Sequence, residues 1–385
     1  MVARGLMLMG TSLLLLAALP CMAELSTNAE ILVLAGGTRM SDTATTMSAA
    51  EGRVSFQVEA SKEVKGALEI NTLIVPGTVP YVLLDVPRAY VKVRFPGFRF
   101  TAGKTRLSWG NGFVFDAGDV IFGGMTSRLD LSLADPRDQT VWLLSTYVPL
   151  EDFSFIEAVA LPFMPPTASA MIPGLPAISA APATPGSPLI PFESLNAGAR
   201  AVVEFAGLSL EAGYLFDNAG DLHKPYVGLQ TSLFFDLYGA AGIATPVHTA
   251  SWDDAKKNLR LSCGLFRIFS LGSAGTLSTR LEAGFLPYGP WKAVPGGLDP
   301  SSPGYGAMVF GDVAYSPVDT FSLQTRAMVS PVDASCLVMA GVSWSIYQGL
   351  AITATGLVML GEANDVFGWG RDGDVSVIAG LDYRF

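Results

Sequence analysis

The residues best suited to chemistry are cations that recur at alternate positions. Arg88, Lys92 and Arg94 are separated by even numbers of residues, and Arg99 follows after a tight Pro-Gly turn. Because successive side chains of a strand point to opposite faces, this spacing puts the first three cations on one face, and the turn brings Arg99 beside them on the next strand. The spacing therefore predicts a strip of four positive charges on one face of two neighbouring strands, and such a strip attracts anions.

Two groups of carboxylates could face this basic strip. The long connection at 106–138 contains Asp116, Asp119 and Asp130. Glu59 and Glu69 instead lie on the two expected strands that precede the strip, 51–60 and 66–75. Pairing across the sheet would then be purely structural, because charges inside a protein need partners.

Groups for enzyme or metal chemistry are scarce. The chain has only 2 His, and both His223 and His248 fall in expected connections between strands. A catalytic triad or an acid–base pair needs positioned side chains, which neighbours in sequence do not supply. Cys263 and Cys336 lie on apolar positions of different strands, so we expect them neither to pair nor to bind metal. These residues predict a protein without enzyme activity, cofactor or metal.

Composition narrows the class of protein. The chain has 385 residues, of which 50% are hydrophobic and 15% charged, with a net charge of −10. The acidic balance argues against a nucleic-acid partner. A membrane-spanning helix needs about 20 consecutive apolar residues, and the uncharged stretch 162–191 contains nine prolines, which a helix does not tolerate. A large all-β protein remains, either soluble or with its apolar face toward lipid.

The N-terminus reads as an export signal. Within residues 1–23, Arg4 gives the basic start, 6–19 the apolar core, and Ala23 a small residue before the cleavage point. Acylation at Cys21 is the alternative. We expect 24–385 to be the mature chain, a single domain.

Apolar and polar residues alternate over most of that mature chain. At the C-terminus Val375, Val377, Leu381, Tyr383 and Phe385 share one parity, and charged or small polar residues occupy most of the other. A tilted membrane strand needs about 9 to 11 residues, with apolar side chains toward lipid and polar ones toward the lumen. The segments fit that length. We therefore predict an all-β fold, a transmembrane antiparallel β-barrel of about 16–18 strands.

Eighteen segments are candidate strands. They are 29–37, 51–60, 66–75, 87–95, 98–105, 139–148, 152–161, 196–205, 208–216, 224–235, 236–245, 257–268, 275–286, 303–315, 319–330, 334–346, 349–360 and 373–385. An even count requires 29–37 to be the first strand. Its unbroken apolar run leaves an N-terminal plug as an alternative, and 128–134 is a possible additional strand.

The final residues Leu381-Asp382-Tyr383-Arg384-Phe385 resemble the C-terminal signature of bacterial outer-membrane β-barrel proteins. The resemblance implies a bacterial outer-membrane location with lipid around the barrel. It also implies that Leu381, Tyr383 and Phe385 are read by the barrel-assembly machinery. With the C-terminus in the periplasm, alternate connections become short periplasmic turns, and the long ones near 106–138 and 162–195 become extracellular loops.

The porin branch of this group suggests a function. In general porins a long extracellular connection folds into the lumen and sets acids opposite a basic ladder, and the 106–138 connection resembles it in length and charge. The resemblance implies constriction-loop acids at Asp116, Asp119 and Asp130, opposite the basic strip. We therefore expect passive diffusion of small solutes through a water-filled barrel, which could be part of an oligomer.

The uncharged stretch 162–191 keeps two other functions open. It could capture hydrophobic ligands, as in outer-membrane fatty-acid transporters. The barrel could also be an adhesin or ligand-binding surface protein in which the loops at 162–195 and 287–302 matter most. A Pro-stiffened loop folded over the barrel mouth would need neither function.

Overall fold

The chain is almost entirely strand. The computed structural model describes residues 24–40, 43–77, 81–118, 140–151, 153–163, 195–218, 220–248, 252–298, 302, 304–368 and 374–385. Its strands are β1 (Glu24–Met40), β2 (Thr43–Glu59), β3 (Val64–Val75), β4 (Tyr81–Arg94), β5 (Arg99–Arg106), β6 (Thr140–Pro149), β7 (Phe155–Phe163), β8 (Asn196–Phe205), β9 (Leu208–Asp217), β10 (Leu222–Ser232), β11 (Asp236–Gly242), β12 (Thr245–Pro246), β13 (Arg260–Ser270), β14 (Thr276–Phe285), β15 (Ala307–Val318), β16 (Phe321–Ser330), β17 (Ser335–Tyr347), β18 (Leu350–Leu360) and β19 (Asp374–Arg384).

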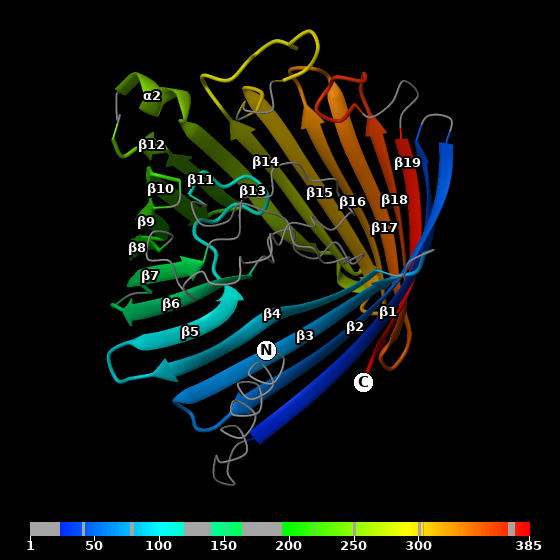
Figure 1. Cartoon of the computed structure of the whole chain (residues 1–385), viewed down its shortest axis with the longest axis horizontal. Coiled ribbons are helices and arrows are strands. Elements are labelled where there is room, and N and C mark those ends of the chain that lie inside the picture. The colour runs from blue at the N-terminus through cyan, green and yellow to red at the C-terminus, as the bar shows by residue number, and fades with distance from the viewer. Residues whose placement is uncertain are drawn as a thin grey trace, which may run out of the picture.

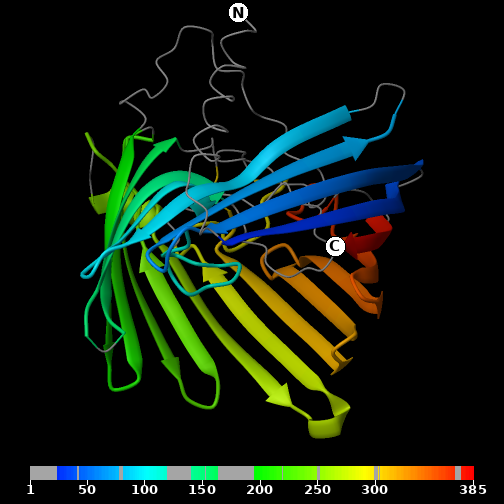
Figure 2. The same cartoon turned by 90° about the horizontal axis from the view of Figure 1, so that it is seen from below.

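These strands form one closed antiparallel barrel (Figures 1 and 2). Each strand pairs with its sequence neighbours, and β1 pairs with β19 to close the sheet. The two residues of β12 pair with β10, as β11 does, so β12 continues the β11 strand. The 19 segments therefore make 18 barrel strands. All 18 predicted segments are confirmed as strands, with ends that differ by up to eight residues.

Side-chain direction follows the predicted alternation. Leu381 and Tyr383 of β19 are 46% and 43% exposed on the outer face, and Phe385, which follows β19, is 63% exposed. Asp374 and Asp382 of the same strand are buried. The apolar parity therefore faces outward and the polar parity faces the lumen, as in a barrel that sits in lipid.

The unbroken apolar run of β1 has a structural explanation. Leu34 of β1 is buried on the inner face, where it packs with Ala49 of β2 and Leu73 of β3. Ile378, which breaks the alternation of β19, packs against the same cluster. The lumen wall is apolar at this place, so β1 is apolar on both faces. The alternative of an N-terminal plug is wrong for 24–40, because these residues form a barrel strand.

All of the long connections lie at one end of the barrel, and the other end has only short turns. Single turns follow even-numbered strands early in the chain, such as the one at Ala206–Gly207, where both residues have positive φ. One predicted turn is misplaced: Ser316–Val318 belongs to β15, and the turn follows at 319–320. Pro317 has no backbone N–H to donate, and the β15–β16 register shifts between Tyr315 and Val318 to accommodate it.

The long connections span 107–139 and 164–195, close to the predicted loops. A short helix, α2 (Trp252–Lys257), lies in another connection at the same end. Residues 1–23, 128–134 and 164–191, and with them the predicted signal peptide, extra strand and uncharged stretch, lie outside the described residues. None of the described helices has the length and apolar character to cross a membrane.

Candidate transport site

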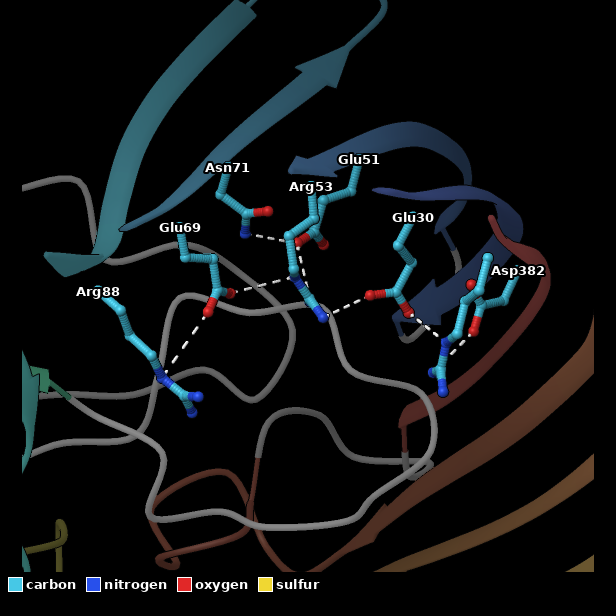
Figure 3. Close-up of polar contacts among 8 residues, drawn as sticks. Glu30, Glu51, Arg53, Glu69, Asn71, Arg88 and Asp382 are labelled. Atoms are coloured by element: carbon cyan, nitrogen blue, oxygen red, sulfur yellow. Dashed lines mark hydrogen bonds and ion pairs between the residues drawn. The ribbon is translucent and has the colours of Figure 1, made fainter. Parts of the chain in front are cut away.

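A network of alternating charges covers the inner wall over β1 to β4 (Figure 3). At its centre, Arg53 of β2 places Nη1 2.5 Å from Oε2 of Glu30 and Nη2 3.4 Å from Oε1 of Glu51. Its Nε lies 3.4 Å from Oε1 of Glu69. Glu69 in turn lies 3.7 Å from Nε of Arg88 on β4. The network joins four strands because inward side chains on neighbouring strands stand side by side.

The same network crosses the seam where the barrel closes. Nε of Arg384 lies 3.0 Å from Oε1 of Glu30 on β1, and its Nη2 lies 2.9 Å from Oδ2 of Asp382. Backbone bonds hold the seam at this end, because Ala29 and Phe385 exchange N–H···O bonds of 2.9 and 3.0 Å. Charge pairing and strand pairing therefore fix the last strand to the first together.

The remaining cations of the predicted strip lie near the short-turn end. Arg94 and Arg99 are directly opposite each other across the β4–β5 turn. Arg99 stacks over the ring of Tyr147 at 4.0 Å, and Nζ of Lys92 lies 5.9 Å from the ring of Tyr90. All three cations are exposed. Among the described residues none of the three lies within 4.0 Å of a carboxylate, so a solute can reach their charge.

The chain between β5 and β6 enters the lumen. Residues 107–118 lie inside the ring of strands as the cyan segment after β5 (Figure 1). Trp109 is completely buried and donates from Nε1 to Oε2 of Glu157 at 3.2 Å. The amide of Gly110 donates to Oε1 of Glu211 at 3.2 Å. We call 107–118 the inner segment; its first half is held by acids of β7 and β9.

The second half of the inner segment is held by one carboxylate of β14. Glu282 is 1% exposed and accepts hydrogen bonds from the amides of Phe113, Val114 and Phe115 at 2.6, 2.7 and 2.9 Å. The hydroxyl of Tyr238 also donates to it. Three amides around one buried carboxylate form charge-assisted bonds, which are about twice as strong as neutral ones. The segment is therefore tied across the lumen to the wall opposite β4.

Asp116 organises the inner segment itself. Its carboxylate accepts from the amide of Gly112 at 2.9 Å and from the amide of Gly118 at 2.8 Å. The next residue, Ala117, donates its amide to Oγ of Ser262 at 2.9 Å. Asp116 thus stabilises a compact loop inside the barrel.

The structure brings together only some of the predicted site residues. Arg88 is paired with Glu69, one of the two acids that lie on expected strands. Asp119 and Asp130 lie outside the described residues. The predicted entry of this connection into the lumen is seen for residues 107–118. The predicted position of its acids opposite the basic strip stays a prediction.

The acids that hold the inner segment were not identified from sequence. Besides Glu282, these are Glu157 and Glu211, which bind Arg200 at 2.9 and 3.0 Å. The hydroxyl of Tyr226 donates to Glu211 as well. The sequence did contain a signal, because each of these acids lies on the inward parity of a strand whose other residues are mostly small or apolar. A carboxylate buried there is costly without a partner, so each acid could have been expected to bind one.

No family model and no curated protein matches the sequence. Solved structures do match. Pseudomonas aeruginosa OccK2 (OpdF) has 12% identity and a TM-score of 0.57, covering 94% of this chain and 98% of that one. Pseudomonas aeruginosa OpdL has 12% identity and a TM-score of 0.55, covering 94% and 99%. The outer membrane protein OprD of Pseudomonas aeruginosa has 9% identity and a TM-score of 0.53, covering 93% of each. The chain is similar to these proteins in fold over nearly its whole length, which confirms the predicted β-barrel fold.

Proposed function

We propose that the protein is an outer-membrane channel through which small solutes diffuse passively, with a preference for anions. The observation that carries the proposal is the inner wall. Exposed Lys92, Arg94 and Arg99 lie on one side, and the inner segment is tied to the other side by buried acids. The solute path runs between the two. No step forms or breaks a covalent bond.

The likeness in fold supports an organic anion as solute. The chain is also similar in fold to the structure of Pseudomonas aeruginosa OccK2 (OpdF) in complex with glucuronate. A carboxylate of that kind would meet guanidinium and ammonium groups near the short-turn end of this barrel. In the bacterial outer membrane we place this end in the periplasm. Residues 1–23 act as the cleaved export signal, and Leu381, Tyr383 and Phe385 address the assembly machinery.

The test is single-channel recording of the refolded chain 24–385 in a planar bilayer under a salt gradient. We expect discrete openings with anion preference. Replacing Lys92, Arg94 and Arg99 together by Gln should lower the anion-to-cation permeability ratio roughly threefold or more, because fixed charges concentrate counter-ions.

The control is Arg267→Gln, which removes one cation from the outer face and should leave the permeability ratio unchanged. A closed barrel that never conducts would refute the open channel. Openings whose selectivity is the same in the triple variant would leave the channel standing and remove the basic strip as its selectivity element.

A further inference from the structure

One arginine points away from the lumen. On β13, Leu265 is opposite Leu281 of β14, which is 49% exposed on the outer face. Arg267 lies two residues further along β13, opposite Thr279. Paired residues of antiparallel strands share a face, so Arg267 lies on the outside of the barrel with these residues.

Aromatic rings fix the position of its guanidinium. The guanidinium carbon of Arg267 lies 4.2 Å from the ring centre of Phe234, in the β10–β11 turn, and 5.7 Å from that of Phe269. Phe235 packs edge-on against Phe234, with ring centres 5.0 Å apart. Leu233, beside these rings, is 76% exposed. The cation is held on an apolar outer surface.

The charge has no anionic partner among the described residues. No carboxylate there lies within 4.0 Å of Arg267, and its Nε is buried without a hydrogen-bond acceptor. The acid nearest in register, Asp236, is opposite Phe266 and therefore faces the lumen. A charge on a surface facing lipid is costly unless an anion pairs with it.

The position of Arg267 along the barrel axis indicates which anion could pair with it. Arg267 lies three residues before the end of β13, at Ser270. With a rise of about 3.3 Å per residue and a tilt near 45°, this is about 7 Å from the strand end. Aromatic girdles of membrane barrels lie at this level, beside the lipid headgroups. A guanidinium binds phosphate oxygens with two parallel hydrogen bonds.

We propose that Arg267, held by Phe234 and Phe269, binds the phosphate group of a phospholipid in the leaflet on the short-turn side. This site lies outside the solute path. It rests on the proposed membrane location of the barrel and is independent of what the lumen transports.

The test is native mass spectrometry of the folded chain 24–385 in detergent with added phosphatidylglycerol. Arg267→Gln should reduce the population that retains one lipid roughly tenfold, because a charge-assisted pair is lost. The matched control is Arg280→Gln, which removes a cation opposite Phe266 on the lumen face and should retain lipid as the original chain does. Phe234→Leu keeps the site apolar without the ring and should reduce retention by a smaller factor, about threefold.

Two further arms identify the ligand. Diacylglycerol with the same acyl chains lacks the phosphate and should be retained no better by the original chain than by Arg267→Gln. Inorganic phosphate at the lipid concentration should not displace the lipid. Equal retention in Arg267→Gln and the original chain overturns the proposal, as does retention of diacylglycerol equal to phosphatidylglycerol or displacement by inorganic phosphate. Conductance of the same samples is read separately, so a failed channel and a failed lipid site give different results.

Discussion

At the scale of single residues, Glu282 holds the second half of the inner segment against the barrel wall. It is almost completely buried, and the backbone amides that it binds come from a segment 167 to 169 residues earlier in the chain. A buried carboxylate is costly unless hydrogen bonds replace its water. Glu282 and the inner segment therefore depend on each other: the acid needs the amides, and the amides need an acceptor.

Glu282→Gln should release the inner segment. A neutral amide offers one acceptor oxygen where the carboxylate offers two, and its NH2 group faces other donors. We expect the free energy of unfolding to fall by about 3 kcal/mol, because hydrogen bonds to charged groups contribute about 1.5–3 kcal/mol each. Chemical denaturation in detergent measures the change, and open-channel current noise should increase.

Glu59→Gln is the matched control for that change. Glu59 pairs with Lys65 at 2.5 Å, but both side chains are about half exposed, at 53% and 52%. Exposed ion pairs contribute only about 0–1 kcal/mol. If both substitutions cost the same small amount, the inner segment does not depend on Glu282.

At the scale of elements, Asp333 ties the β16–β17 turn to the connection after β18. Its carboxylate accepts from the hydroxyl of Ser335 at 2.8 Å and from the amide of Val366 at 2.8 Å. Burial alone would raise the pKa of Asp333, but hydrogen bonds to the carboxylate, from Val366 and Ser335 among others, outweigh burial and lower the pKa.

The lowered pKa of Asp333 predicts a local pH dependence. A carboxyl whose pKa is depressed by folding stabilises the folded state above its ordinary pKa of 3.8, and this contribution is lost as the pH falls through the lower, folded value. We expect the Val366 amide to lose protection from hydrogen exchange below about pH 3.8. Exchange rates corrected for intrinsic pH dependence measure this, and Asp333→Asn should show no such step. A step of the same size in Asp333→Asn would assign it to another group.

The elements were largely predictable from sequence and the site was only partly so. Period-two alternation is local, so it predicted the strands from 51–60 onward. The unbroken apolar run of 29–37 left open whether that segment was a strand or a plug, and its pairing with β19 depends on barrel closure, which is not local. The partners across the lumen depend on barrel register and on where the inner segment crosses. Nothing in the spacing of Phe113 and Glu282 indicates their contact. The buried pairing of Glu157 with Arg200 was also missed, because it depends on barrel register.

At the scale of the whole molecule, the net charge of the chain does not indicate which charges a solute meets in the lumen. The chain carries a net charge of −10, yet several of its lumen acids are bound to amides or arginines. Acids of β1 to β3 pair with Arg53 and Arg88 (Figure 3). The cations near the β4–β5 turn have no such partner among the described residues, and this distribution, rather than the total, supports anion preference.

The C-terminal residue offers a test of how the whole barrel is built. The backbone of Phe385 pairs with Ala29, but its side chain is 63% exposed on the outer face. Phe385→Ser keeps the backbone bonds. The matched control is Trp344→Ser, which removes an outer-face aromatic that is 50% exposed. We expect the two refolded variants to have about the same free energy of unfolding. If Phe385 belongs to the assembly signal, only Phe385→Ser should reduce the amount of folded barrel in the outer membrane of expressing cells. Equal amounts of both variants would mean that the terminal aromatic has no special role, and its position at the end of β19 would then reflect membrane anchoring alone.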